Sequence, residues 1–243
     1  MFPVWFDWLA YAMLALGFIC AVWIAADVIR HPQNMAVMSV VWPVTALFGT
    51  VLTTWAYYRY GRASTQAAMA DAQAKGQAMP SKRQAFGAVV GKGALHCGAG
   101  CMIGDVIAEW LAFLVPAVAV WVGWHTVFEE KLYAVWVLDF ILAFGLGIGF
   151  QYFAIAPMRN LSLGKGLLAA LKADTLSLAS WQVGMYGFMA FTQFYWFPRA
   201  FGTRAEVDTA AFWFAMQLAM MAGFITAYPV NWWLIRRGLK EKM

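Results

Sequence analysis

Long apolar runs, separated by short segments that carry most of the charge, constrain the fold of this chain more than any other feature. Of its 243 residues, 63% are hydrophobic and only 12% are charged, whereas about 25% of residues are charged in a soluble domain. A helix needs about 20 apolar residues to cross the hydrocarbon of a bilayer. Six runs reach that length: Trp5–Ile29, Met35–Tyr58, Ile103–Trp124, Leu132–Ala156, Thr175–Phe197 and Thr209–Ile235. The sequence therefore predicts an all-α, polytopic membrane helix bundle with about six transmembrane helices.

The basic residues predict how this bundle is oriented, because basic loops stay on the cytoplasmic side of a membrane. Twelve of the 17 Lys and Arg residues fall in residues 59–84, in residues 157–174 or in the C-terminal tail. The alternate loops hold only Arg30, Lys131, Arg199 and Arg204. Six spans with both termini in the cytoplasm satisfy this bias. We therefore expect one membrane domain over residues 1–243, with a cytoplasmic loop at 59–84 and a cytoplasmic connector at 157–174.

The connector has an amphipathic part. Residues 161–172, LSLGKGLLAALK, place Leu on one side of a helix and Lys on the other. This pattern predicts a short helix on the inner membrane surface. A solvated connector without such a helix is the alternative interpretation.

Residues 85–124 are nearly continuous and mostly apolar. A single helix of this length would measure about 60 Å, twice the thickness of the hydrocarbon. The glycine-rich part of the segment therefore predicts a broken third span, with a short half-helix before His96. Gly100 and Gly104 also form a pair of small residues one turn apart, which favours tight packing against another helix.

The stretch GALHCGAGCMIGDVIAEW, residues 93–110, holds most of the ionisable groups. On a helix, Cys97, Cys101, Asp105 and Glu109 lie four residues apart in succession and form one stripe. Ionisable groups are costly against lipid, so this stripe should face the interior of the bundle. Carboxylates buried in a membrane are candidates for carrying protons or for pairing with a cation.

Two thiols one helical turn apart, Cys97 and Cys101, lie beside His96 and predict a soft-metal site. Thiolate and imidazole ligands select Cu(I), Zn(II) or an iron centre. Three methionines of the fifth and sixth spans are candidate further ligands, since thioethers suit Cu(I): Met185 and Met220, both near mid-membrane, and Met189, one turn from Met185. The alternative interpretations are that the cysteines are small buried hydrophobes or a redox pair, and that the methionines only fill gaps between helices.

Four polar residues inside the predicted spans are candidates for a proton or ion path: Asp105, Glu109, Asp139 and Gln217. By their distance from the ends of their spans, Asp139 and Asp27 should lie in the outer half of the membrane. Asp27 fits better as a packing residue, and for Asp139 both interpretations stay open.

Several stretches also carry a resemblance to a known family: HCGAGCMIGD (96–105), FGLGIGFQYFAIAPM (144–158), ADTLSLASWQVGMYGFMA (173–190) and YPVNWWLIRRGLKEKM (228–243). Together they resemble the bacterial integral membrane proteins called domain of unknown function 4396. The resemblance implies a multi-pass protein of the bacterial inner membrane and brings no established activity. Relatives fused to heavy-metal-binding domains favour a link to metal ions.

The preferred functional hypothesis is a membrane protein that binds or transports a soft metal ion, with copper first and zinc or iron as alternatives. The second is a non-catalytic accessory subunit of a larger membrane complex. A haem or quinone oxidoreductase is less favoured, because the chain has only His31, His96 and His125. Without a nucleotide-binding loop or an HExxH motif, no enzyme activity and no nucleotide cofactor are expected. The expected partners are the lipid bilayer and other membrane subunits or copies of this chain, and not nucleic acid.

Overall fold

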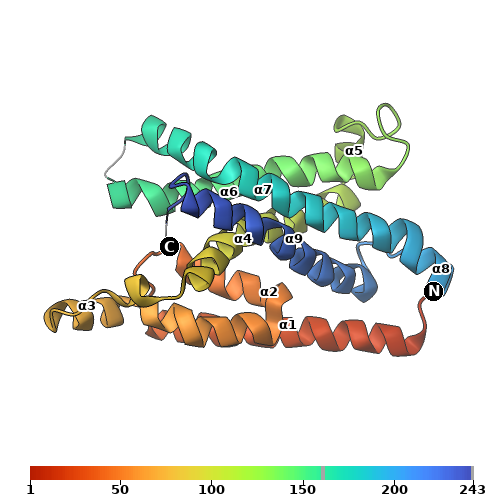
Figure 1. Ribbon diagram of the computed structural model, residues 1–243. Helices are drawn as coiled ribbons and strands as arrows, with labels where there is room; N and C mark the ends of the chain where they lie inside the picture. Colours follow the sequence, from red (N-terminus) through yellow and green to blue (C-terminus); the bar gives the residue numbers. More distant parts are fainter. Residues whose placement is uncertain (160–161, 242–243) are drawn as a thin grey trace.

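A computed structural model describes residues 1–159 and 162–241, and it is helical throughout (Figure 1). The prediction of an all-α bundle is confirmed, since the described residues form no β-strand. The long helices are α1 (Val4–Arg30), α2 (Met38–Ala56), α4 (Phe86–Leu114), α6 (Lys131–Arg159), α7 (Leu163–Phe191) and α9 (Ala210–Arg236). The short elements are η1 (Tyr57–Gly61), η2 (Arg62–Ser64), α3 (Gln66–Ala74), η3 (Pro80–Arg83), α5 (Ala117–Trp121), η4 (Thr192–Trp196) and α8 (Phe197–Phe201).

Five helical segments are long and apolar enough to cross a membrane: α1, Met38–Ser64, α4, α6 and α9. Helix α7 is less apolar, but with 29 residues it is as long as α4 and lies along the same bundle (Figure 1). The surface of the bundle presents large apolar side chains, among them Phe18, Trp23, Val183 and Ile225, each more than 60% exposed. Such a surface suits lipid rather than water, so the chain is a multi-pass membrane protein.

The second apolar segment does not cross the bundle, because the chain reverses at Thr50. That residue has φ 44° and ψ −121°, which breaks the helix. The ring centroids of Trp42 and Tyr57 are 5.6 Å apart, and the Thr53 hydroxyl donates a hydrogen bond of 3.3 Å to the carbonyl of Thr45. In a straight helix, residues 15 apart would be separated by about 22 Å. Helix α2 and the segment after it therefore form a re-entrant hairpin.

The hairpin returns to the end of α1 from which it started. The Tyr57 hydroxyl donates a 2.6 Å hydrogen bond to the Asp27 carboxylate, and the Arg62 guanidinium forms an ion pair with the same group at 2.9 Å. The backbone N–H of Asn34 donates to the carbonyl of Ser64 at 2.9 Å. Figure 1 shows the orange hairpin leaving the left end of α1, turning near the middle of the bundle and coming back.

The reversal changes the number of crossings, so that α1, α4, α6, α7 and α9 run the length of the bundle. The two termini then lie at opposite ends (Figure 1). At one end the Phe2 ring packs on Phe197 and Phe201, with ring centroids 5.0 and 5.3 Å away. At the other end Phe86 packs on Trp232 at 4.7 Å. The prediction of six crossings with both termini on one side is wrong, because length and composition do not distinguish a crossing helix from a hairpin.

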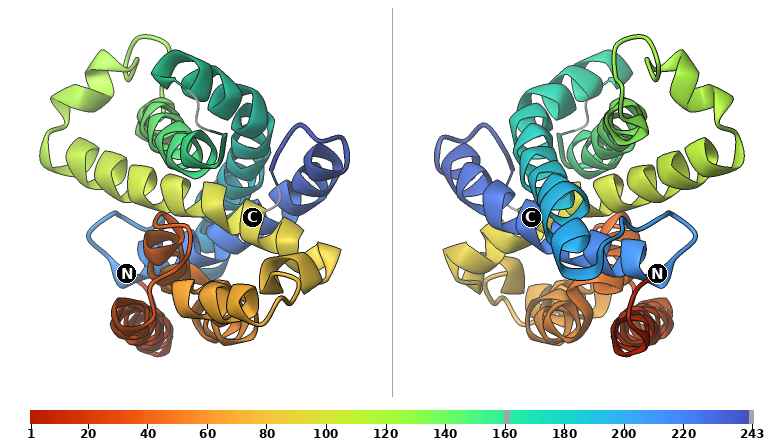
Figure 2. Two further views of the ribbon diagram at one scale, coloured as in Figure 1. Left: turned by 90° about the vertical axis from the view of Figure 1, so that its left-hand side faces the viewer. Right: turned by 90° about the vertical axis from the view of Figure 1, so that its right-hand side faces the viewer.

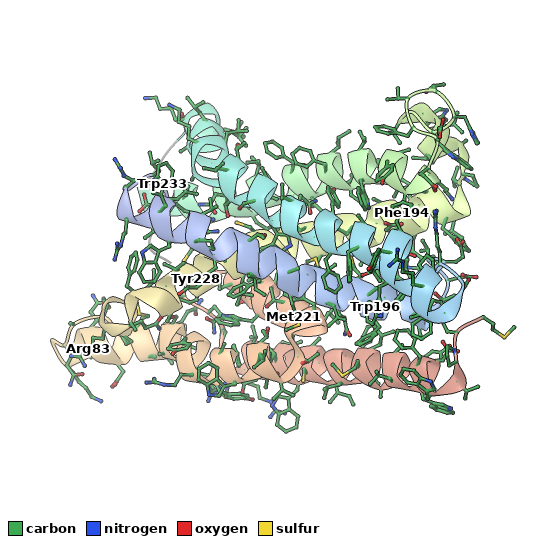
Figure 3. All side chains as sticks on the ribbon, turned by 45° about the vertical axis from the view of Figure 1, so that its right-hand side comes forward. Arg83, Phe194, Trp196, Met221, Tyr228 and Trp233 are labelled. Carbon is green, nitrogen blue, oxygen red and sulfur yellow. The ribbon has the colours of Figure 1, made fainter. Side chains whose placement is uncertain are left out.

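The two ends differ in charge. Residues 31–37, 59–85 and 237–241 form one end, which we call the basic end; Arg83 and Trp233 lie there in Figure 3. The opposite end is formed by the N-terminus and by residues 115–130 and 202–209. As expected, the 59–84 loop and the C-terminal tail share one end. Asp27 and His31 also belong to it, contrary to the six-span expectation that placed them on the outer side.

Helix α4 is continuous from Phe86 to Leu114, so the predicted break before His96 is wrong. Its glycines serve packing instead. A Cβ atom at Gly100 would lie 2.9 Å from the Cα of Gly147, and one at Gly104 would lie 2.6 Å from the backbone nitrogen of Ala143. These contacts confirm that Gly100 and Gly104 allow a close approach of another helix, which is α6.

The predicted connector at 157–174 is mostly helix. Helix α6 continues to Arg159, and the segment from Leu163 onward forms the first turns of α7 rather than a separate surface helix. Residues 160 and 161 of the predicted connector lie outside the described residues. The continuity of α7 has a functional consequence, since it brings Asp174 inside the bundle.

The apex of the hairpin is held by a side chain of α9. Within a membrane, the backbone groups of a broken helix must be satisfied by other parts of the protein. The Gln217 amide donates to the carbonyls of Leu47, at 2.6 Å, and Met13, at 3.3 Å. A Cβ atom at Gly17 would overlap the Leu47 carbonyl, so this glycine admits the apex. Gln217, which the sequence suggested for an ion path, therefore anchors the hairpin.

The five-crossing topology predicts where labels react in intact cells. We expect a cysteine introduced at Thr203 and an epitope tag at the N-terminus to be reached from outside, and a cysteine at Gln73 only after permeabilisation, because the basic end should be cytoplasmic. Impermeant maleimide labelling and antibody binding measure this. If the N-terminal tag becomes accessible only after permeabilisation, as the cysteine at position 73 should, the five-crossing topology is contradicted. If the cysteine at position 73 is labelled in intact cells and the one at position 203 is not, the orientation is contradicted.

The anchoring role of Gln217 predicts a loss of stability on substitution. Gln217→Leu should destabilise the protein by about 1–3 kcal/mol, because it removes the donor from a buried carbonyl. Denaturant unfolding in detergent measures the change, and Gln73→Leu on the exposed face of α3 is the matched control. Equal stability of the two variants would show that the apex does not depend on this amide.

Candidate functional site

The stripe of ionisable groups on α4 faces the interior of the bundle, as the sequence predicts. Cys97, Cys101 and Asp105 are fully buried, and Glu109 is 2% exposed. Helix α4 crosses the middle of the bundle, with α1 and α2 on one side and α6 and α7 on the other (Figure 2). The stripe therefore forms the main part of a buried polar row. Side chains from other segments join the stripe near each of its ends and form two separate clusters with it.

Near the basic end, Lys240 lies in the first cluster, which we call the ammonium cluster. Its members come from three helices and from the segment after the last of them: Cys97 of α4, Asp174 and Ser177 of α7, Asn231 of α9, and Lys240 after α9. All of them are at most 3% exposed. Residues 77 and 143 positions away from Cys97 thus meet at its sulfur.

The Lys240 ammonium is surrounded by acceptors. Its Nζ lies 2.6 Å from Asp174 Oδ1, 3.0 Å from Cys97 Sγ and 3.2 Å from the carbonyl of Gly93. Burial alone would lower the pKa of Lys240, but the Asp174 carboxylate and the Cys97 sulfur more than offset this and raise it above its ordinary value. The ammonium is therefore charged at neutral pH and compensates the buried carboxylate.

Further hydrogen bonds tie the cluster together. Cys97 Sγ lies 2.8 Å from Asp174 Oδ1 and 2.9 Å from Ser177 Oγ, and the Asn231 amide donates to Ser177 Oγ at 2.7 Å. These partners of Cys97 are not among the residues predicted from the sequence. The three-residue spacing of Asp174 and Ser177, which places both on one helix face, is the local signal that could have indicated them.

The second cluster, which we call the carboxylate cluster, consists of Asp105, Glu109 and Asp139. The contacts of Gly100 with Gly147 and of Gly104 with Ala143 fix the antiparallel register of α4 and α6. Asp139 lies one turn before Ala143 and is fully buried within electrostatic range of both α4 carboxylates. Asp139 therefore belongs to the polar row, and not to packing alone.

The carboxylate cluster has few protein partners. Among the described residues, no well-formed hydrogen bond reaches either oxygen of Asp105 or of Asp139, or Oε1 of Glu109, and the Gln182 amide is close enough to Asp105 to favour its ionised form. The nearest polar groups come from α7: Gln182 lies beside Asp105, and its amide donates to the Tyr186 hydroxyl at 3.1 Å. Buried carboxyl groups without partners are costly, so their positions call for a proton or a bound cation.

A pocket of about 200 Å³ leads from the opposite end towards this cluster. Glu109 lines it, and the Lys131 ammonium lies within electrostatic range of that carboxylate. Other charged residues at its rim are Glu130, Arg204 and Glu206. Glu109 thus belongs both to the carboxylate cluster and to a pocket at the opposite end of the bundle.

The predicted metal ligands are all buried but are not grouped as a ready site. His96 is fully buried beside the backbone carbonyl of Phe150 on α6, and neither ring nitrogen makes a well-formed hydrogen bond with the described residues. Met185, Met189 and Met220 are fully buried in the same apolar core as Cys97 and Cys101. Across residues 1–159 and 162–241, no three His, Cys, Asp or Glu side chains are grouped so that they could hold a metal ion. The three-ligand metal site stays a prediction.

Comparison with known proteins places this site in a family. A family model described as domain of unknown function (DUF4396) matches residues 88–240. The chain belongs to this family. No curated protein and no solved structure matches it. The DUF4396 region contains nearly all of α4, the whole of α6, α7 and α9, and Lys240, so it includes both clusters; α1 and the hairpin precede it.

The buried ion pair of Asp174 and Lys240 predicts strong coupling between the two residues. Asp174→Asn and Lys240→Met should each cost about 3–5 kcal/mol, because each leaves a buried charge without its partner. The double variant should lose clearly less than the sum of the two. Denaturant unfolding of all four proteins gives the coupling energy.

The pair of Asp71 and Lys75, 2.8 Å apart compared with 2.6 Å for Asp174 and Lys240 but about 60% exposed, is the matched control. Removing either of its charges should change stability by about 0.5 kcal/mol or less. Additive losses at Asp174 and Lys240 would contradict the ion pair.

Proposed function

We propose that this protein transports a cation across the membrane along the polar row, and that the cation is a soft metal ion such as copper. One observation carries the proposal: buried ionisable side chains follow each other from the pocket at the opposite end to the ammonium cluster. Their order is Glu109, Asp139, Asp105, Cys101 and Cys97, with Asp174 next to Cys97.

The carboxylate cluster supports a path for positive charge. Burying three acidic side chains within electrostatic range of one another lowers the stability of the folded protein. Apolar residues of similar volume would fill the same space without this loss, so packing alone does not explain the acidic residues. Ionisable residues inside membrane bundles mark ion pathways and proton relays. A cation that passes Asp105 and Asp139 supplies the positive partner that these carboxyl groups lack. Protons can neutralise the carboxyl groups again when the cation leaves.

The choice of a soft metal ion rests on the sulfur atoms. Cys97 and Cys101 lie one turn apart on the row, and thiolates prefer Cu(I) and Zn(II) over hard cations. The ring nitrogens of His96 make no well-formed hydrogen bond within the described chain, although the carbonyl of Phe150 approaches them, and they add a borderline ligand. Ligands that meet the ion one or two at a time suit transport, because an ion held by a complete ligand set leaves too slowly.

The proposed location is the cytoplasmic membrane of a bacterium, with the basic end facing the cytoplasm. The distribution of Lys and Arg supports this orientation. In this arrangement the pocket beside Glu109 faces outward, and the ammonium cluster lies near the cytoplasmic surface.

Reconstitution into liposomes tests the function. Vesicles with the purified protein should take up Cu(I) down its gradient, as measured by a metal indicator inside the lumen. Asp139→Asn should lower the initial rate about tenfold or more, since it removes an ionisable carboxyl group from the middle of the path. Asp208→Asn at an exposed position of the opposite end is the matched control and should leave the rate unchanged.

The outcomes separate the parts of the proposal. Uptake of protons without Cu(I), Ag(I) or Zn(II) would keep the cation path and reject the metal ion. No cation flux in vesicles that contain folded protein would reject transport, and the accessory-subunit hypothesis would then lead. Equal rates for Asp139→Asn and the control would place the path elsewhere.

A further inference from the structure

We propose that the ammonium cluster is a binding site for a thiophilic metal ion, and that Lys240 is a tethered cation that occupies it. This inference deepens the proposed function, because it names the site that closes the basic end of the polar row. Binding at the site can nevertheless be measured without any transport.

The atoms around the Lys240 ammonium are arranged like ligands around a cation. Four acceptors lie within 3.4 Å of Lys240 Nζ: a carboxylate oxygen of Asp174, the sulfur of Cys97, the carbonyl of Gly93 and the hydroxyl of Ser177. An ammonium group has three hydrogens to donate, one fewer than the acceptors available. Acceptors converging from two helices on one positive charge resemble the ligand shell of a cation more than a simple ion pair.

The ammonium cluster also contains acceptors that the ammonium does not use. Within the described part of the chain, Asp174 Oδ2 and Asn231 Oδ1 have no hydrogen-bond partner, although both residues are fully buried. Buried acceptors are nearly always paired in folded proteins. A metal ion in place of the ammonium could bind both carboxylate oxygens. His96, within electrostatic range of Asp174, offers a further nitrogen.

The ligand atoms identify the class of ion. When the ammonium leaves, the cluster presents one thiol that can ionise, one carboxylate, one hydroxyl and one backbone carbonyl. A thiolate combined with oxygen ligands suits a soft or borderline ion such as Cu(I), Zn(II) or Cd(II), whereas Mg(II) and Ca(II) prefer oxygen alone. Binding would release the thiol proton.

Lys240 is attached to the bundle by a short segment. This segment follows α9 and turns at Gly238 in the left-handed conformation, with φ 69°. The neighbouring Leu239 is 51% exposed, whereas the Lys240 side chain enters the bundle. The N–H groups of Leu239 and Lys240 donate to the carbonyl of Leu234 at 3.0 and 3.4 Å, so the Lys240 side chain can leave the cluster while its backbone stays joined to α9. The Lys240 ammonium thus occupies the site as a plug, in the sense that an incoming metal ion must displace it before binding.

Cadmium binding to the full-length protein in detergent tests the assignment. The wild type should bind Cd(II) at the cluster weakly, because Lys240 competes for it. Lys240→Met should bind one equivalent about tenfold more tightly or better, with the ultraviolet absorption of a cadmium–thiolate bond. Lys240→Arg keeps the positive charge and should behave like the wild type. Adding Cys97→Ser to Lys240→Met should abolish the absorption, whereas adding Cys101→Ser should preserve it.

A measurement on the wild type covers the case in which Lys240→Met does not fold. Acetylation of surface amines, read by mass spectrometry, should leave Lys240 unmodified without metal and modify it when Cd(II) is added. Lys75, which is exposed directly after α3, is the internal control and should react equally in both conditions. In Cys97→Ser, Cd(II) should have no effect on Lys240.

The results that would overturn the site are equally definite. They are folded Lys240→Met without the thiolate absorption, absorption that survives Cys97→Ser, or acetylation of Lys240 that ignores Cd(II). Failure of transport is a separate result. Cd(II) binding without flux in vesicles would leave a metal site in a protein that does not transport, and flux with no Cd(II) binding at Cys97 would leave a path without this plug.

Discussion

The close approach of α4 and α6 is the contact on which the candidate site depends. Helices in a bilayer gain little from the hydrophobic effect when they associate, so they are held by van der Waals packing between small residues. Gly100 against Gly147 and Gly104 against Ala143 bring the two backbones together and allow one register. That register places Asp139 within electrostatic range of Asp105 and Glu109. A shift by one turn would separate these carboxyl groups and turn at least one of them towards apolar surroundings.

The two clusters on α4 differ in how their charge is compensated. The Asp174 carboxylate has an ammonium partner from its own chain at 2.6 Å. The carboxyl groups of Asp105 and Asp139 have none among the described residues, and Glu109 has a Lys131 ammonium nearby, at a pocket. Because burial of an uncompensated charge is costly, a mobile positive charge is the natural complement of the carboxylate cluster. The same need for a compensating positive charge explains why Lys240 is buried beside Asp174 at the other end of the row.

The N-terminal part supports the core and adds little to the row. Helix α1 and the hairpin pack on α9 and α4, and Gln217 joins them by satisfying a carbonyl at the apex. The DUF4396 region begins after them, at residue 88. A re-entrant hairpin within a membrane is stable only where other parts of the protein cover its broken backbone. Helix α9 covers the apex of this hairpin.

Three features can be predicted from the sequence alone: the helical class, the inward direction of the Cys97–Glu109 stripe and the role of Gly100 and Gly104 in packing. These features follow from helical periodicity and from the cost of placing charge against lipid, which act within a single helix. The tertiary structure decided the rest. The apolar run that contains Thr50 has the same length and composition whether it crosses or turns back, so only its contacts with α1 reveal the hairpin and the side on which the N-terminus lies. Likewise, Asp174 and Lys240 meet Cys97 from 77 and 143 residues away, because the register and topology of separate helices bring them together and no local spacing records that.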